Sequence, residues 1–524
     1  MKDQGTVMST NKREPVLIAN RGEIAIRVAR SAKALGFPTV AVYSDADRFS
    51  EHVRACDQAV YIGGSAPRES YLNVEKVIAA AKATGAKYIH PGYGFLSERP
   101  HFVEACEAAG LVFLGPSAES MRLMGDKITA RKTVDSLNVP RVPGSPGAVQ
   151  DAREAALYAK EIGYPVLLKA AAGGGGKGMR RVDAEAEMAS AFEGSSREAL
   201  NAFGDGSMYV EKLILRPHHV EVQVFGDGRG GAIHLGEREC SIQRRHQKVW
   251  EESPSPLMEQ YPEMREKMFE SALRVAKHVN YSGAGTFEFV ADSQANFYFL
   301  EMNTRLQVEH PVSEWVTGVD LVAWQLLLAA GEWSLPPQSP SRRGSSLEVR
   351  LYAEDPRTFL PAPGPIGQIR FPSGAFIRSD TAFTEAGEVS QHYDPMIAKL
   401  SVWGRDRAEA VERMRVALDE VRVEPPKRRD GTRQGSLRTN LTFLRRLTRD
   451  AKVIEGDTPT DLIASTPALT AALASSESIS QEAAIALSLF ELIQESPESH
   501  AQSAETTGPS SLWGWVARRE GVRP

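Results

Sequence analysis

The chain has 524 residues, of which 42% are hydrophobic and 25% are charged, and its formal net charge at pH 7 is −5. This length is too great for one compact core, so we expect two to four domains. The composition excludes a disordered chain, and the small net charge gives no indication of nucleic-acid binding.

Strands and helices alternate through the first part of the chain. Residues 16–20 form a short apolar run, and residues 23–35 carry apolar side chains at helical spacing, followed by Gly36 where a helix C-cap belongs. The alternation continues with strands at 39–43, 86–89 and 112–114 and helices at 72–84 and 102–109. This pattern predicts a parallel sheet covered on both faces. We therefore expect a doubly wound α/β domain over residues 15–127.

A proline-rich connection at 139–147 separates this domain from a smaller segment. A helix at 152–162 and a strand at 166–171 precede a run of four glycines, and more strand follows up to Glu211. We expect this segment, residues 140–215, to form a lid.

The rest of the chain is strand-rich at first and then mixed, which predicts a mixed core over residues 216–450. The chain as a whole is therefore expected to be a multidomain protein of the α/β and α+β classes. Residues 424–437 form a basic, proline-bearing loop to which we assign no role. Residues 455–524 are rich in Ala, Ser and Glu, and we expect one helix there, at 481–494.

The glycine run at 173–178 matches G-x-G-x-x-G, but it lies between two strands, whereas a dinucleotide fingerprint needs a helix after it. It is not a Walker A loop, because Lys177 is followed by Gly178. One interpretation is a hairpin whose backbone N–H groups cover phosphates, with Lys169 supplying charge from the preceding strand. The alternative is a flexible surface turn.

Two carboxylates and an amide lie within otherwise apolar strand patterns. Residues 286–290 and 297–303 are expected to pair as a hairpin across a short DSQAN turn. Glu301 and Asn303 are two residues apart and share a face, which Glu288 can join from the neighbouring strand. Buried carboxylates are costly without compensation, and Mg²⁺ prefers oxygen ligands. We predict a metal site here; the alternative is a solvated sheet face, against which the flanking apolar residues argue.

Arg305, Gln307 and Glu309 continue the same odd-numbered parity. If the chain stays extended, a cation, an amide and a carboxylate line one cleft, which suits binding of a small oxyanion and removal of its proton. An ordinary Arg–Glu ion pair is the alternative.

Residues 237–250 (ERECSIQRRHQKVW) are dense in basic side chains. Because no aromatic residues alternate with them, nucleic-acid stacking is not indicated, and we favour anion binding by Gln243, His246 and Lys248. Cys240 is predicted to be a packed residue, since no His–Asp arrangement surrounds it.

Several features predict a cytoplasmic protein. The cysteines, Cys56, Cys106 and Cys240, are far apart in the sequence, which fits a reducing compartment and neither a disulfide framework nor a zinc site. The N-terminal residues contain no apolar stretch typical of a secretion signal, and no apolar run of about 18 residues predicts a membrane span.

Six motifs in order resemble the biotin carboxylase family of ATP-grasp enzymes, over about residues 15–450. They are NRGEIA at 20–25, HPGYGFLSE from His90, MGDK ending at Lys127, the glycine run, QRRHQK at 243–248 and EMNTRLQVEHPVSE from Glu301. The resemblance implies an N-terminal α/β domain, a mobile lid and a mixed C-terminal domain that completes the ATP site.

The resemblance also implies residue roles in ATP-dependent carboxylation of biotin, via carboxyphosphate. Bicarbonate would be held by Lys248, Arg305, Gln307 and the backbone of Val308, with Glu309 as general base, and Arg350 would steady the enolised biotin oxygen. The implied metal ligands for Mg²⁺ (or Mn²⁺) are Glu288, Glu301 and Asn303. The implied ATP contacts are Lys127, Lys169, Gly175, Gly176, Glu211, Lys212, Ile214, His219, Gln243, His246, Glu288 and Glu301.

The catalytic motifs around Lys177, Tyr352 and Tyr393 resemble those of methylcrotonoyl- and propionyl-type α subunits, but the Met-Lys-Met signature of a biotin-carrying domain does not occur in the sequence. We therefore expect a biotin carboxyl carrier protein acting in trans, carboxyltransferase subunits and a homodimer, with no nucleic-acid or membrane partner. Two other interpretations remain: another ATP-grasp carboxylate–amine ligase, and a non-catalytic nucleotide-binding scaffold.

Overall fold

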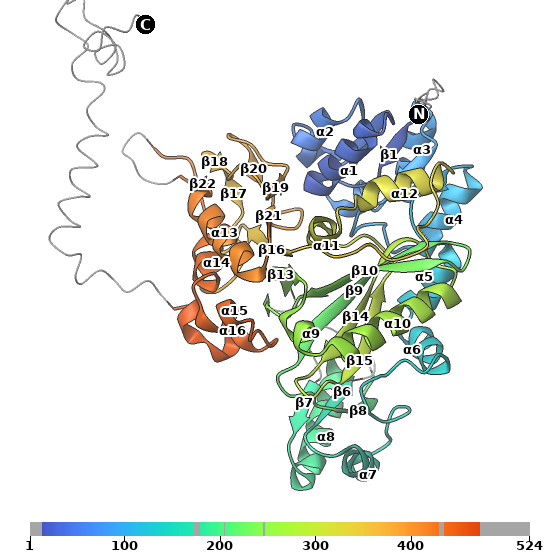
Figure 1. Cartoon of the computed structure of the whole chain (residues 1–524), viewed down its shortest axis with the longest axis vertical. Helices are drawn as coiled ribbons and strands as arrows, with labels where there is room; N and C mark the ends of the chain where they lie inside the picture. The colour runs from blue at the N-terminus through green and yellow to red at the C-terminus, as the bar shows by residue number, and fades with distance from the viewer. Residues whose placement is uncertain (1–12, 171–178, 204, 245–246, 429–433, 472–524) are drawn as a thin grey trace, which may run out of the picture. The chain divides into compact units, whose positions relative to one another are not determined.

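The computed structural model describes residues 13–170, 179–203, 205–244, 247–428 and 434–471, and Figure 1 shows their arrangement. The N-terminal part is a parallel sheet in the order β3-β2-β1-β4-β5. Its strands are β1 (Val16–Ile18), β2 (Thr39–Ser44), β3 (Gln58–Gly63), β4 (Tyr88–His90) and β5 (Val112–Phe113), and its helices are α1 (Gly22–Ala34), α2 (Glu51–Ala55), α3 (Val74–Thr84), α4 (Pro100–Ala108) and α5 (Ala118–Gly125).

Both faces of this sheet are covered, as the alternation of strands and helices predicts. Val16 and Ile18 pack in one core with α1, while Leu17 and Ala19 pack in a second core with α3 and α4. Strand β3 and helix α2 were not expected, because the side chains of β3 are largely exposed and carry no clear apolar pattern. The α/β domain therefore has the predicted doubly wound form.

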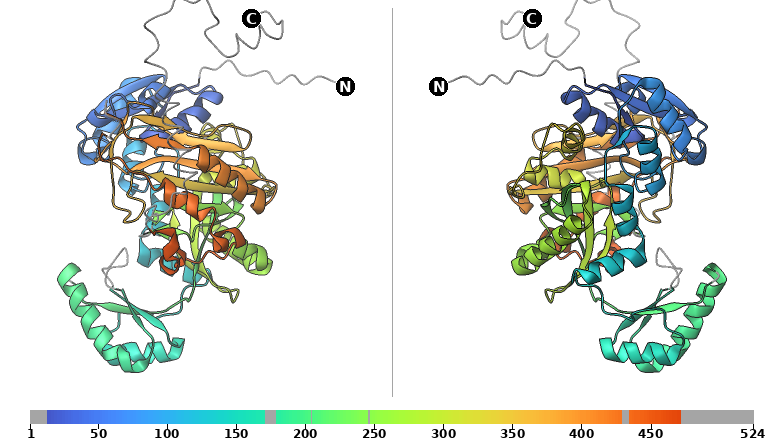
Figure 2. Two further views of the ribbon diagram at one scale, coloured as in Figure 1. Left: turned by 90° about the vertical axis from the view of Figure 1, so that its left-hand side faces the viewer. Right: turned by 90° about the vertical axis from the view of Figure 1, so that its right-hand side faces the viewer.

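The lid has a small sheet and a core of its own. Strand β6 (Val166–Ala170) lies between β7 (Met179–Val182) and β8 (Met208–Lys212), with α7 (Ala152–Ile162) and α8 (Met188–Phe203) packed against one face (Figure 2). The core includes Ala155 of α7, Leu168 of β6 and Val210 of β8. Connections at 139–151 and 213–217 join the lid to the rest of the chain. Because the buried residues of this core all come from the lid segment, its internal packing does not depend on the large sheet.

The centre of the structure is an eight-stranded antiparallel sheet in the order β15-β14-β9-β10-β13-β16-β21-β19. The strands are β9 (His218–Asp227), β10 (Ala232–Glu239), β13 (Trp250–Ser253), β14 (Ser282–Ala291), β15 (Phe297–Asn303), β16 (Ser345–Tyr352), β19 (Ile377–Thr381) and β21 (Met396–Gly404). The predicted hairpin of residues 286–290 and 297–303 is confirmed as the pair β14 and β15.

The two faces of this sheet differ in chemistry. Along β9, Val220, Val222 and Val224 pack against helix α10 (Pro262–His278), whereas Glu221 and Gln223 point to the opposite face. Helix α11 (His310–Thr317) covers part of that polar face beside β10, β13, β16 and β21. Charged side chains are thus gathered on one face of the sheet, part of which α11 covers, and they line the site described below.

The C-terminal strands form a further core with helices α13 (Arg407–Glu420) and α14 (Leu441–Leu447). Leu462 and Leu469 pack into the same core, so the alanine-rich segment begins within the folded unit. The helix expected at 481–494 and residues 429–433 of the basic loop lie outside the described residues.

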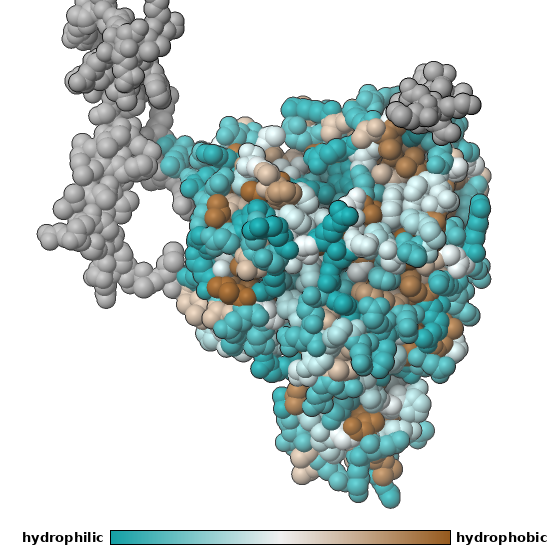
Figure 3. Space-filling model, in the orientation of Figure 1, coloured by the Kyte–Doolittle hydropathy of each residue, from teal (hydrophilic) through white to brown (hydrophobic). Residues whose placement is uncertain are grey.

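The described helices include none that is both long and apolar enough to cross a bilayer. On the face drawn in Figure 3, hydrophobic residues occur in small separate patches among hydrophilic ones. This surface offers no single broad apolar area on that side.

Candidate active site

A cavity of about 790 Å³ lies over the polar face of the large sheet. Its walls come from the N-terminal domain, the lid, the large sheet and the turn after β15, and most of the predicted site residues line it. These are Lys169, His219, Gln243, Lys248, Glu288, Glu301, Asn303, Arg305, Gln307, Val308, Glu309 and Arg350.

The floor of the cavity is a row of charged residues across four strands. Glu301 of β15 pairs with Glu288 of β14, Glu288 with Glu221 of β9, and Glu221 with Arg238 of β10. Arg238 Nε donates to Glu221 Oε1 at 2.5 Å, and its two other nitrogens donate to Gln223, Thr286, Ser313 and Gln307. This fully bonded guanidinium fixes the floor.

A bulge at Leu300 makes the predicted metal-ligand face possible. Phe299 pairs with Phe289 and Glu301 with Glu288, so Leu300 is an extra residue on β15 and is 44% exposed. Without it, strict alternation would place Glu301 and Asn303 on the same face as Phe297 and Phe299. The bulge turns the polar residues toward the cavity and keeps the phenylalanines in the core.

The prediction that residues 305–309 stay extended is wrong. The chain leaves the strand at Asn303 and turns irregularly before α11. Their side chains still meet at the cavity: Arg305 Nη2 donates to Asn303 Oδ1 at 3.0 Å, and Gln307 Nε2 donates to Glu288 Oε1 at 3.0 Å. Lys399 Nζ donates to the carbonyl of Val308 at 2.6 Å, which holds the turn from the other side.

Lys248 is the central cation of the cavity. Its Nζ lies 2.6 Å from Glu221, 3.0 Å from Glu288 and 2.7 Å from Glu309. Burial alone would lower the pKa of Lys248, but these carboxylates raise the pKa well above its usual value. The ammonium is therefore permanently charged, as anion binding requires.

Glu309 is shared between Lys248 and Arg350, whose Nη2 donates to Glu309 Oε2 at 2.8 Å. Burial alone would raise the pKa of Glu309, but Lys248, Arg350 and Arg238 hold the pKa far below its usual value. Glu309 is thus ionised throughout the neutral range and able to accept a proton. A substrate anion that pairs with Lys248 or Arg350 in place of Glu309 would raise the pKa of Glu309 and make this carboxylate a stronger base.

The predicted metal ligands supply oxygen donors on one wall of the cavity. Glu288 and Asn303 are in contact through Asn303 Nδ2 at 2.7 Å, and the exposed Glu301 lies opposite Glu288. Ligand atoms of His219, Glu221 and Glu288 also approach one another within 4.8 Å, but Lys248 binds two of these carboxylates. Carboxylate and amide oxygens are donors that a hard divalent cation prefers, so such a cation fits the set formed by Glu288, Glu301 and Asn303.

Among the other predicted ATP contacts, some lie at the cavity and others do not. Lys169 of β6 lines the cavity and is paired with Glu211. Lys212 Nζ donates to the carbonyls of Gly163 and Tyr164 at 2.8 and 3.0 Å, so its ammonium is directed away from the cavity, and Ile214 lies in the connection after β8. Gly175, Gly176, His246 and the side chain of Lys127 lie outside the described residues.

Cys240 is confirmed as a packed residue. All three cysteines are buried and free, and burial raises the pKa of Cys56 to about 11 and the pKa of Cys106 to about 12. Burial also raises the pKa of Cys240 well above its usual value. A thiolate nucleophile is not available at these positions.

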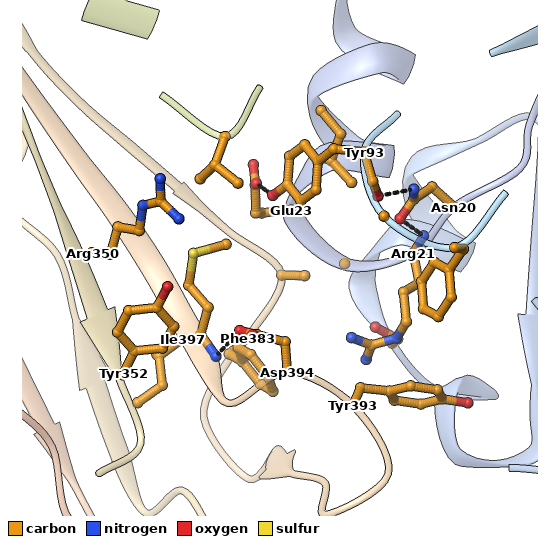
Figure 4. A pocket seen from close by; sticks show the side chains of 18 of the residues that line it. Asn20, Arg21, Glu23, Tyr93, Arg350, Tyr352, Phe383, Tyr393, Asp394 and Ile397 are labelled. Atoms are coloured by element: carbon orange, nitrogen blue, oxygen red, sulfur yellow. Dashed lines mark hydrogen bonds between the residues drawn. The ribbon is translucent and has the colours of Figure 1, made fainter. Parts of the chain in front are cut away.

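A second cavity, of about 520 Å³, lies between the N-terminal domain and the C-terminal strands. The two cavities share Arg305, Val308, Arg350, Tyr352 and Asp394 in their linings. Figure 4 shows Arg350 and Tyr352 on one wall of the second cavity, facing Glu23, Tyr93 and Arg21. Arg350 therefore stands at the junction of two spaces, with Glu309 on one side of it.

Sequence reasoning missed three residues of the site. Glu98 binds both the backbone N–H of Thr304 at 3.0 Å and Arg305 Nε at 2.9 Å. Glu221 and Arg238 form the floor. Glu98 lies within the HPGYGFLSE motif, and Glu221 alternates with His219 in β9, so motif and strand parity were the signals that could have found them.

A lid with a glycine run, set beside an antiparallel sheet whose charged face carries lysines and acidic oxygen donors, defines a ligase of the ATP-grasp class. Three family models match consecutive parts of the chain. They are the biotin carboxylase N-terminal domain at residues 12–121, the ATP-binding domain of the carbamoyl-phosphate synthase L chain at 126–336, and the biotin carboxylase C-terminal domain at 348–465.

Curated relatives agree with these matches. Biotin carboxylase 2 of Bacillus subtilis is 48% identical, with 86% of this chain and 98% of that protein covered. The propionyl-CoA carboxylase alpha chain of Ruegeria pomeroyi is also 48% identical, over 86% of this chain and 67% of that protein. The chain spans about 61% of the mouse methylcrotonoyl-CoA carboxylase alpha subunit. The chain belongs to the biotin carboxylase family.

Solved structures agree in fold. The biotin carboxylase of Campylobacter jejuni, in a β,γ-ATP complex, is 45% identical with a TM-score of 0.78, covering 86% of this chain and 98% of that chain. The biotin carboxylase domain dimer of Hydrogenobacter thermophilus 2-oxoglutarate carboxylase, in complex with MgADP, ADP and bicarbonate, is 44% identical with a TM-score of 0.78, covering 88% and 99%. The expected ATP-grasp fold is confirmed.

Proposed function

We propose that this chain carboxylates biotin with ATP and bicarbonate, as the first half-reaction of an acyl-CoA carboxylase. One observation carries the assignment of residues: Arg350 lies between the two cavities and is paired with Glu309 at 2.8 Å. A base for bicarbonate, which lines the first cavity, is thus adjacent to a cation that lines both cavities. A two-step carboxylation through a short-lived intermediate requires that arrangement.

In the first step, Lys248, Arg305 and Gln307 hold bicarbonate against Glu309, which accepts its proton. The oxyanion attacks the γ-phosphorus of ATP, the bond to the β-phosphate oxygen breaks, and carboxyphosphate and ADP form. Phosphoryl transfer leaves the protein little covalent chemistry to do, so the protein contributes mainly by positioning the reactants and by stabilising charge. Lys169 of the lid would stabilise the charge of the phosphates.

In the second step, carboxyphosphate releases CO₂, and the phosphate takes the N1 proton of biotin. The electron pair moves to the ureido oxygen, where Arg350 stabilises the negative charge, and N1 then attacks CO₂. We place biotin in the second cavity, since Arg350 and Tyr352 reach it there. Closure of the lid would keep carboxyphosphate from water.

Glu288, Glu301 and Asn303 would hold Mg²⁺ or Mn²⁺ together with ATP. When bound, such an ion bridges phosphate oxygens and offsets their charge. Without such an ion, Lys248 Nζ pairs with Glu288, and His219 Nε2 lies 3.2 Å from the same carboxylate.

Glu301→Gln should raise the Mg²⁺ concentration needed for half-maximal turnover by at least about tenfold, because it removes a charged oxygen donor at an exposed position. A Mg²⁺ titration of ADP release measures this. Glu263→Gln, an exposed glutamate of α10, is the matched control. An unchanged Mg²⁺ dependence in Glu301→Gln would exclude Glu301 as a ligand.

ADP release by the purified chain tests the function. It should need bicarbonate and rise further with biotin. Stimulation by an amine or amino acid instead of biotin would favour another ATP-grasp ligase, and ATP binding with no ADP release under any condition would favour a non-catalytic scaffold.

For partners, we propose a biotin carboxyl carrier protein acting in trans, carboxyltransferase subunits and a homodimer. The carrier proposal is supported by the near-complete coverage of a relative named as a biotin carboxylase alone, and the homodimer by a related domain solved as a dimer. We also propose that residues 483–493, within the helix expected at 481–494, serve as a docking or capping element for partners; they lie outside the described residues.

The 524-residue chain should give no band in a streptavidin blot after expression with a biotin ligase. The only Met-Lys pair is Met1-Lys2, and the sequence contains no Met-Lys-Met. A biotinylated carrier added to the same ligase is the positive control. A band at the mass of this chain would contradict the carrier in trans.

A further inference from the structure

A buried carboxyl pair lies directly behind Arg350 and has no part in the steps above. Glu251 of β13 and Glu348 of β16 are opposite each other in the antiparallel register, and both side chains are 0% exposed. The side chains of directly opposed residues lie about 5 Å apart, so two ionised carboxylates at these positions would repel strongly.

The two carboxyls are bonded very differently. Glu251 Oε1 accepts a hydrogen bond from Arg350 Nε at 2.6 Å and lies 2.6 Å from Arg350 Nη2. Among the described residues, neither oxygen of Glu348 has a hydrogen-bond partner. A carboxylate with no donor in a dry sheet is very costly, whereas a neutral carboxylic acid costs far less. The geometry therefore places the negative charge on Glu251 and a proton on Glu348.

Arg350 is consequently held by two carboxylates. Its Nη2 lies 2.6 Å from Glu251 and 2.8 Å from Glu309. Glu309 must accept a proton during the reaction and then ceases to be a charged partner, while Glu251 stays in place behind the guanidinium. Of these two carboxylates, only Glu251 can therefore orient Arg350 in both steps.

We propose that Glu251 is a positioning residue that holds the Arg350 guanidinium in the orientation needed for the biotin step, with Glu348 as its neutral neighbour. This inference rests on the proposed role of Arg350. It adds a residue that touches neither substrate and acts through the arginine.

The surroundings support this assignment of charge. The pKa of Glu251 is raised to about 7, mainly by burial. The positive charge of Arg350 lowers this pKa, and the negative charge of Glu309 raises it. Burial also raises the pKa of Glu348 well above its usual value, opposed by Lys399. The charged or titratable groups that act on the pair come from several elements: Arg350 and Tyr352 of β16, Cys240 and Lys248 between β10 and β13, Asp380 of β19, Lys399 of β21, and Glu309 before α11.

A pH dependence follows from the raised pKa of Glu251. Above about pH 7 Glu251 is ionised and orients Arg350; as the pH falls through that value the charge is lost. Biotin-dependent turnover of the unmodified chain should therefore fall on the acid side, with an apparent pKa that belongs to the coupled pair. In the unliganded chain the pKa of Glu309 is held far lower, so Glu309 does not contribute to the acid limb of kcat/KM, which reports the free enzyme.

Glu251→Gln keeps the shape of the side chain and removes its charge. We expect biotin-dependent ADP release to fall at least about tenfold, the usual range for a residue that orients a catalytic group, and the acid limb near pH 7 to disappear. Bicarbonate-dependent ADP release without biotin should stay within about threefold. Glu348→Gln, which preserves the neutral state, should leave both reactions within about twofold.

Three results with the variants would overturn the proposal. They are unchanged biotin-dependent turnover in Glu251→Gln, an equal loss of both reactions in that variant, and a loss of more than about fivefold in Glu348→Gln. An acid limb in the unmodified chain that is identical with and without biotin would also overturn it, and needs no variant to fold. If the unmodified chain showed no response to bicarbonate and biotin, the proposed function itself would fail; a normal response with an unaffected Glu251→Gln would remove only the positioning role.

Discussion

Glu309→Gln should abolish nearly all ADP release, both with and without biotin, while ATP still binds. Glu309 is ionised and faces the cavity beside Lys248, where bicarbonate would lie. Removal of a proton-accepting group costs about 10²–10⁴-fold in rate. Both reactions fall together, because bicarbonate is deprotonated before biotin is involved.

Two measurements make this result specific. Equilibrium binding of ATP should stay within a few fold of the unmodified chain, and Glu263→Gln on the exposed surface of α10 should retain full activity. Arg305→Ala should behave like Glu309→Gln, since Arg305 contacts Asn303 at the same cavity. Turnover within a few fold in either Glu309→Gln or Arg305→Ala would remove that residue from the bicarbonate site.

Arg350→Ala should separate the two steps. Biotin-dependent turnover should fall by about 10²–10³-fold, the usual cost of losing a group that stabilises an oxyanion. Slow bicarbonate-dependent ADP release should survive, because carboxyphosphate forms without biotin. Parallel assays of ADP release with and without biotin measure the difference.

Arg407→Ala is the matched control for Arg350→Ala. Arg407 pairs with Glu252, the neighbour of Glu251 in β13, but it does not line the cavity. Any loss it causes should affect both reactions equally, through stability. An Arg350→Ala variant with the same equal loss would identify Arg350 as a folding or ATP-site residue instead.

Local sequence patterns predicted much of the fold because the segments involved are strongly periodic. The helix at 152–162 and the strand at 297–303 coincide with α7 and β15. The alternating strands and helices before residue 127 led directly to the parallel sheet, since β1 and β2 at its centre are buried on both faces.

Local patterns could not supply the features that depend on long-range packing. The bulge at Leu300 exists because Phe297 and Phe299 are needed in the core and Glu301 and Asn303 at the cavity, and strand parity alone gives no sign of it. The turn after Asn303 brings Gln307 to Glu288 without extended backbone.

The pair formed by Glu251 and Glu348 was equally invisible. The two residues are almost a hundred positions apart in the sequence, and only the register of β13 with β16 places them together. Isolated glutamates in strand segments are ordinarily interpreted as solvent-facing. Their burial beneath α11 is a property of the assembled sheet.

Transfer of labelled carbon from bicarbonate to biotin tests the central assignment most directly. With ATP, Mg²⁺, labelled bicarbonate and biotin together, the purified chain should form an acid-labile labelled biotin adduct in amounts matching the biotin-stimulated part of ADP release, and omission of ATP should abolish it. ADP formation with no label on biotin, or label recovered on an amine, would contradict the assignment.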